Sequence, residues 1–166
     1  MLAIGIDPGT AITGYGFVRQ TPSGDLQCVD WGVILTPAKM PLGERLAHIH
    51  ASLATLLEMH HPQVAAVESL FFQRNVRTAM SVGHARGVVL LALQQAGLAV
   101  TDYTPNQVKQ AVSGYGAADK QQMQTMVKTL LGLSELPKPD DAADALAVAI
   151  CHLNTRRSLA ALERAQ

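Results

Sequence analysis

Short apolar runs and longer amphipathic repeats alternate along this chain of 166 residues, and together they predict a protein of mixed α and β structure. The run Val64–Val67 is apolar on both faces, which is typical of a central strand covered by helices. The polar segment Thr21–Asp25 predicts a turn between two neighbouring antiparallel strands. Strands are predicted at Met1–Ile6, Ile12–Gln20, Leu26–Thr36, Gln63–Glu68 and Leu98–Tyr103.

Helical spacing of apolar residues predicts the remaining elements. Thr104-Pro105 is typical of an N-cap followed by proline in the first turn, and Asp119 is placed to cap the next helix. The order β-β-β-α-β-α-β-α-α-α predicts an α/β fold, a ribonuclease H-like mixed five-stranded sheet flanked by helices on both faces. Helices are expected from Leu42 to His60, Arg77 to Gln95, Gln107 to Ser113, Asp119 to Leu131, and from Asp141 onward.

Composition indicates a globular chain: 48% of residues are hydrophobic and 16% are charged. The longest apolar run, Val88–Leu93, is far shorter than the ~20 residues of a membrane-spanning helix. No signal peptide is recognisable at the N-terminus, so we expect a cytoplasmic protein without a membrane. Cys28 and Cys151 lie in no metal-binding spacing and are interpreted as buried thiols.

Four carboxylates are the main candidates for chemistry. Asp7 and Glu68 end two predicted strands, while Asp141 and Asp144 share one face of the first turn of the last helix. Acids without histidine or cysteine partners suit Mg²⁺ or Mn²⁺, and the strand ends of α/β folds commonly carry active sites. Each acid also has a structural explanation: a turn at Asp7, an ion pair at Glu68, and helix capping at the aspartates, for which Asp140 is another candidate.

Basic and aromatic residues follow Glu68. The formal net charge is zero, but neutralising the four candidate acids with metal would leave a charge of +4, and Ser69–Thr101 contains no acid. Aromatic rings among arginines are typical of a surface that stacks on bases and holds phosphates, although a phenylalanine here could equally belong to the core. The candidate nucleic-acid contacts are Phe71, Phe72, Arg74, Arg77, Lys109 and Lys120.

These motifs together resemble the RuvC-type Holliday junction resolvases. The similarity is carried by Gly5-Ile-Asp-Pro-Gly-Thr-Ala-Ile-Thr-Gly-Tyr-Gly16, Ala66-Val-Glu-Ser-Leu-Phe-Phe72, His84-Ala-Arg-Gly-Val-Val89, Gln107-Val-Lys-Gln-Ala111 and Asp141-Ala-Ala-Asp-Ala-Leu-Ala147. It extends from Met1 to about His152. We therefore expect a nuclease domain over residues 1–155 and a flexible C-terminal tail over 156–166. Ser69 departs from the glutamine that many relatives carry there.

The resemblance implies a homodimeric endonuclease that cuts four-way DNA junctions by symmetric paired nicks leaving 5′-phosphates. It assigns Asp7, Glu68, Asp141 and Asp144 as catalytic ligands of two divalent metal ions per subunit, Mg²⁺ or Mn²⁺. It places Phe71 against the distorted junction and Lys109 and Lys120 near the scissile phosphate. A branch-migration helicase complex of the RuvA and RuvB type is the implied protein partner.

Three other functions share part of this pattern. A ribonuclease H-like nuclease that processes pre-ribosomal RNA shares the first hairpin, but would lack the Phe71-Phe72 segment. An ATPase of the actin and Hsp70 superfamily needs two such domains, and 166 residues supply one. A non-catalytic junction-binding protein would not need four acids.

Overall fold

A meander of three antiparallel strands forms one half of the sheet in the computed structural model, which describes residues 1–69 and 76–164, with side chains at 1–69 and 80–163. These strands are β1 (Leu2–Asp7), β2 (Ile12–Gln20) and β3 (Leu26–Leu35). Strand β4 (Val64–Glu68) pairs in parallel with β1, and β5 (Val100–Tyr103) in parallel with β4. The strand order is β3-β2-β1-β4-β5, so the predicted mixed five-stranded sheet is confirmed.

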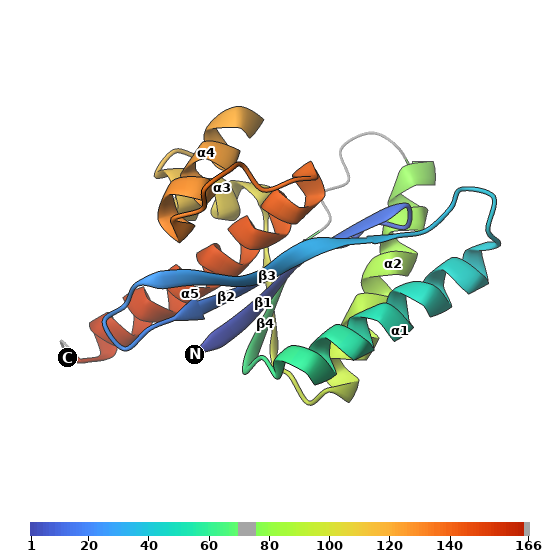
Figure 1. The fold of residues 1–166 in the computed structure, drawn as a ribbon, viewed down its shortest axis with the longest axis horizontal. Coiled ribbons are helices and arrows are strands. Elements are labelled where there is room, and N and C mark those ends of the chain that lie inside the picture. The colour runs from blue at the N-terminus through green and yellow to red at the C-terminus, as the bar shows by residue number, and fades with distance from the viewer. Residues whose placement is uncertain (70–75, 165–166) are drawn as a thin grey trace.

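Helices cover both faces of the sheet, as predicted (Figure 1). One face packs against α1 (Leu42–His60) and α2 (Val76–Gln95). The other packs against α3 (Pro105–Ser113), α4 (Lys120–Leu131) and α5 (Asp140–Arg164).

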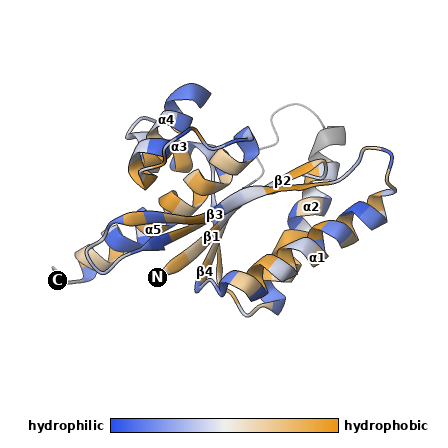
Figure 2. Cartoon of the chain, viewed as in Figure 1, coloured by the Kyte–Doolittle hydropathy of each residue, from blue (hydrophilic) through white to orange (hydrophobic). Residues whose placement is uncertain are grey.

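Alternation along the strands creates the two cores. On β1, Ile4 and Ile6 face α1 and α2, whereas Ala3 faces α5. On β4, Val67 faces the first layer and Ala66 the second. Figure 2 shows the result as hydrophobic colour on β1 and β4 and hydrophilic colour on the outer turns of the helices. No helix among the described residues is long and apolar enough to cross a membrane.

Polar caps define the short helices as predicted. Thr104 accepts a hydrogen bond from the amide of Gln107, and Asp119 accepts one from the amide of Gln122. Each glutamine side chain returns a bond to the backbone of the capping residue, which completes a capping box.

Several predicted boundaries differ from the structure by one or two residues, and two of these differences matter for the description of the fold. Strand β5 begins at Val100 rather than Leu98, because Gly97 adopts a φ of 72° and the Leu98 amide bonds back to the carbonyl of Leu93 at the end of α2. The last helix begins one residue early, at Asp140, and continues to Arg164. Most of the segment predicted as a tail is therefore helical.

Candidate active site

Parallel pairing of β1 and β4 brings the first two acids together. Ile6 is in register with Val67, and Asp7 and Glu68 are the residues that follow them at the same edge of the sheet. The carboxyl ends of neighbouring parallel strands are where open α/β sheets hold their ligands. The structure thus places two of the predicted acids side by side although 61 positions separate them in the chain.

Glycines of β1 and β2 allow α5 to approach the sheet closely enough to add the other two acids. Gly14 is in register with Asp7, and a Cβ atom at Gly14 would overlap the backbone carbonyl of Asp141. A Cβ atom at Gly5 would likewise overlap the carbonyl of Ala145. The helix backbone therefore rests directly on the sheet, and the first turn of α5 lies above the end of β1.

The pKa shifts of two of these acids indicate that the four carboxyl groups lie near one another. Burial, followed by the negative charges of Asp144 and Asp141, raises the pKa of Asp7 to about 6. Burial, followed by the charges of Asp7 and Asp144, raises the pKa of Glu68 to about 8. The contact between the Asp7 and Glu68 carboxyl groups lowers the pKa of Asp7 and raises that of Glu68.

Two lysines stand beside this cluster. Lys109 and Lys120 line a pocket of about 260 Å³ together with Glu68 and Asp144. Burial raises the pKa of Asp144, and both lysines oppose that effect. Lys120 is held by Asp140 at 2.9 Å, and the other Asp140 oxygen accepts a hydrogen bond of 2.7 Å from Gln124. Asp140 is therefore a tether between α4 and α5, not the helix cap considered from the sequence.

The positions of the other predicted DNA-binding side chains are not described by the structure. Phe71, Phe72 and Arg74 lie outside the described residues, and Arg77 lies at the start of α2 where only the backbone is described. Arg86, part of the acid-free stretch, pairs with Asp102 on β5 at 2.6 Å.

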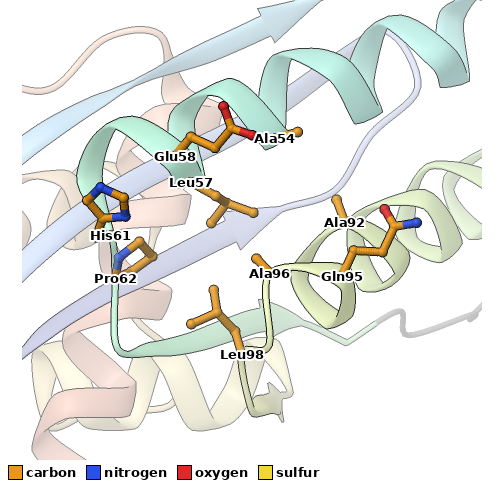
Figure 3. Close-up of a pocket in the computed structure, with 9 residues that line it drawn as sticks. All are labelled: Ala54, Leu57, Glu58, His61, Pro62, Ala92, Gln95, Ala96 and Leu98. Atoms are coloured by element: carbon orange, nitrogen blue, oxygen red, sulfur yellow. The ribbon is translucent and has the colours of Figure 1, made fainter.

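A separate pocket lies at the opposite end of β4, between the C-terminal ends of α1 and α2 (Figure 3). It measures about 420 Å³ and is lined mainly by apolar residues, with Glu58, His61 and Gln95 as its polar members. None of the four acids lines it. The predicted catalytic acids therefore lie outside this larger pocket.

Comparison with known proteins now identifies the relationship. The family model described as crossover junction endodeoxyribonuclease RuvC matches residues 3–152. The chain belongs to the RuvC family. A RuvC of Chloroflexus aggregans is 57% identical over 159 residues, which cover 96% of each chain.

Solved structures agree with this assignment. Thermus thermophilus RuvC in complex with Holliday junction substrate is 40% identical, with a TM-score of 0.90 over 95% of this chain and 96% of that one. The yeast mitochondrial Holliday junction resolvase Ydc2 shares the fold at 18% identity, with a TM-score of 0.70 over 95% of this chain and 79% of that one. The predicted ribonuclease H-like fold and RuvC membership are both confirmed.

Sequence reasoning missed the glycines that seat α5. Gly5, Gly14 and Gly16 on the sheet leave room for the helix, because a Cβ atom at each of them would overlap α5. Gly5 and Gly16 face each other in register across β1 and β2. Glycines spaced two apart in a predicted strand are the signal that could have indicated a close backbone approach.

Proposed function

We propose that this RuvC-family protein resolves Holliday junctions in DNA recombination and repair. It is a metal-dependent endonuclease that cuts four-way junctions by symmetric paired nicks and leaves 5′-phosphates. The observation that carries this proposal is the gathering of Asp7, Glu68, Asp141 and Asp144, from three distant segments, at one edge of the sheet. The names and near-complete coverage of the RuvC relatives support it.

The donor set suits hard divalent cations. Among the described residues, no three acid, histidine or cysteine side chains are already arranged to hold one metal ion. The fit rests instead on charge: burial, followed by mutual repulsion, raises the pKa values of Asp7 and Glu68, and a cation would offset both effects. We assign the four acids as ligands of two Mg²⁺ or Mn²⁺ ions per subunit. Bound ions of this kind activate water and stabilise the departing oxygen.

The remaining residues bind and orient the DNA. Lys109 and Lys120 lie beside Glu68 and Asp144, where their ammonium groups would hold the phosphates flanking the cut. Phe71, Phe72, Arg74 and Arg77 are assigned to the distorted junction and its backbone. Val108 and Met123 add apolar side chains to the lining of this pocket.

Symmetric cutting requires two sites in fixed register, so we assign the protein as a homodimer. Exposed residues of α2 follow one stripe, Met80, His84, Gly87 and Leu91, with alternating spacings of four and three. That spacing is typical of a helix packed along another helix. We also assign a cytoplasmic location and a branch-migration helicase of the RuvA and RuvB type as partner.

Synthetic DNA tests the proposal directly. The protein is incubated with four-way, three-way and linear DNA in Mg²⁺, Mn²⁺ or chelator, and the products are resolved on denaturing gels. We expect paired nicks in the four-way junction with either metal and none with chelator. Tight junction binding without cleavage in any metal would indicate the non-catalytic alternative, and preferential cutting of structured RNA would indicate the RNA-processing one.

A further inference from the structure

The turn that follows Asp7 is held by a set of hydroxyl groups outside the acid cluster. Thr13 donates a hydrogen bond of 2.7 Å from its Oγ1 to the carbonyl of Gly9. Thr36, at the end of β3, donates from its hydroxyl to the carbonyl of Thr10, and its amide bonds the carbonyl of Ala11 at 3.0 Å. The backbone of the turn is therefore fixed from within and from β3.

Thr10 also connects this turn to α2. Its Oγ1 lies 2.5 Å from Oγ of Ser81, across 71 positions of sequence. Thr10 is 7% exposed, and a hydroxyl at so buried a position needs a hydrogen-bond partner. Figure 1 shows the β1–β2 turn reaching toward the first part of α2.

A second helix joins the same set. Arg45 of α1 donates from Nε to the Thr36 hydroxyl at 2.8 Å, and that hydroxyl in turn bonds the turn backbone. The turn after Asp7 is thus tied to α1 through Thr36 and to α2 through Ser81. Thr36 bonds the carbonyl oxygen of Thr10, and Ser81 bonds its side-chain hydroxyl.

We propose that Thr10 and Ser81 are positioning residues for Asp7. Their hydrogen bond fixes the Pro8–Ala11 turn against α2 and thereby fixes the direction in which Asp7 presents its carboxylate to Glu68. The inference rests on the proposed function, because it assigns these hydroxyls a role in the same metal site.

The arrangement has a functional consequence. Helix α2 follows directly on the segment that carries the predicted DNA contacts, and it carries the exposed stripe assigned to the dimer. The Thr10–Ser81 bond makes the position of Asp7 depend on the position of that helix. An error of about 1 Å in a catalytic group can cost up to ~100-fold in rate, so one hydroxyl link is enough to matter.

Isosteric variants test the link. Thr10→Val keeps the volume of the side chain and removes its hydroxyl, while Ser81→Ala removes the partner from a half-buried helix position. For each we expect kcat on a synthetic four-way junction to fall ~10-fold with KM within twofold of wild type. Calorimetric binding of Mn²⁺ without DNA should weaken several-fold. Thr10→Ser, which restores a hydroxyl, should recover most of both.

Matched controls separate positioning from general stability. Thr55→Val and Ser158→Ala each remove an exposed hydroxyl that bonds only a carbonyl of its own helix. They should leave kcat and Mn²⁺ binding unchanged. The double variant Thr10→Val with Ser81→Ala should be no slower than either single variant, because both remove the same bond.

Three results would overturn the inference: wild-type kcat and Mn²⁺ binding in both single variants, additive losses in the double variant, or equal losses in the two controls. If wild-type protein cuts junctions and the variants cut equally fast, only this inference fails. If wild-type protein does not cut junctions, the proposed function fails, and unchanged Mn²⁺ binding in the variants would then separately remove the positioning role.

Discussion

The individual acids of this site are held in an electrostatically unfavourable state. Asp7 and Glu68 have pKa values raised from 3.8 to about 6 and from 4.5 to about 8, first by burial and then by neighbouring charges. Such clusters are typical of sites selected for function over stability. Two consequences can be measured on single residues.

Stability of the metal-free protein should fall as pH rises. A carboxyl group whose pKa is higher in the folded than in the unfolded state binds extra protons when folded, so its ionisation favours unfolding. Between about pH 4 and 8 we expect the free energy of unfolding to decrease by on the order of 2 kcal/mol. Urea unfolding with chelator at several pH values measures it. Glu68→Gln should make the free energy of unfolding less dependent on pH, whereas Glu163→Gln, at an exposed position, should not. The same pH dependence in wild type and both variants would contradict the expectation.

Asp7→Asn should separate binding from cleavage. The substitution removes a charge that repels both its neighbours and DNA, so folding and junction binding should be retained. Cleavage should fall by at least ~100-fold, as expected on loss of a preorganised charged group. Gel-based cleavage and binding assays on one junction measure both. Cleavage within a few-fold of wild type would remove Asp7 from the metal site.

The two pocket lysines should increase the salt dependence of junction binding. If Lys109 and Lys120 each contact a phosphate, replacing both with alanine should reduce the slope of log affinity against log salt concentration by ~0.9 per contact. Junction binding by fluorescence anisotropy at several salt concentrations gives the slope. Lys39→Ala with Lys128→Ala removes the same charge elsewhere and should change the slope less. An unchanged slope in the first pair would make both lysines ordinary surface residues.

At the scale of elements, the close packing of α5 on the sheet determines where Asp141 and Asp144 lie. Gly14→Ala would force the Asp141 carbonyl and the helix away from β2, because the added methyl has no space. We expect a loss of about 1–3 kcal/mol in stability, and a fall in cleavage at temperatures where the variant is still folded. Gly43→Ala, in α1, adds a methyl that meets nothing within 4 Å and is the matched control. Cleavage equal to wild type in Gly14→Ala would mean that the acids tolerate a displaced helix.

At the scale of the whole molecule, we expect paired cutting to depend on the exposed stripe of α2. Leu91 is 51% exposed in the single chain, so Leu91→Glu should leave the monomer folded and bury an unpaired charge only in a dimer. We expect a folded monomer in sedimentation and loss of coordinated double nicking. Met59→Glu, on α1 at 66% exposure, is the control that should remain dimeric. Wild-type protein that sediments as a monomer at micromolar concentration with junction DNA would refute the dimer.

The features that could be predicted from the sequence are those that depend on local patterns of residues. Alternating and helical apolar repeats predicted every described element in order, and the Thr104 and Asp119 caps predicted where two helices begin. The start of β5 escaped prediction because Gly97 extends the helix cap over Leu98, which is apolar enough to suit either element. Local polarity cannot decide between two backbone states that bury the same side chain.

The sequence alone pointed to the four candidate acids, to the strand ends and the helix turn that carry them, and to the RuvC family. Only the tertiary structure decided that these acids share one site, that Asp140 tethers Lys120, and that Thr10 meets Ser81. The reason is physical: periodicity records which face of an element is buried, whereas the partner across that face depends on strand pairing and helix seating. Gly14 shows the difference, because its role exists only when Asp141, 127 positions away, rests upon it.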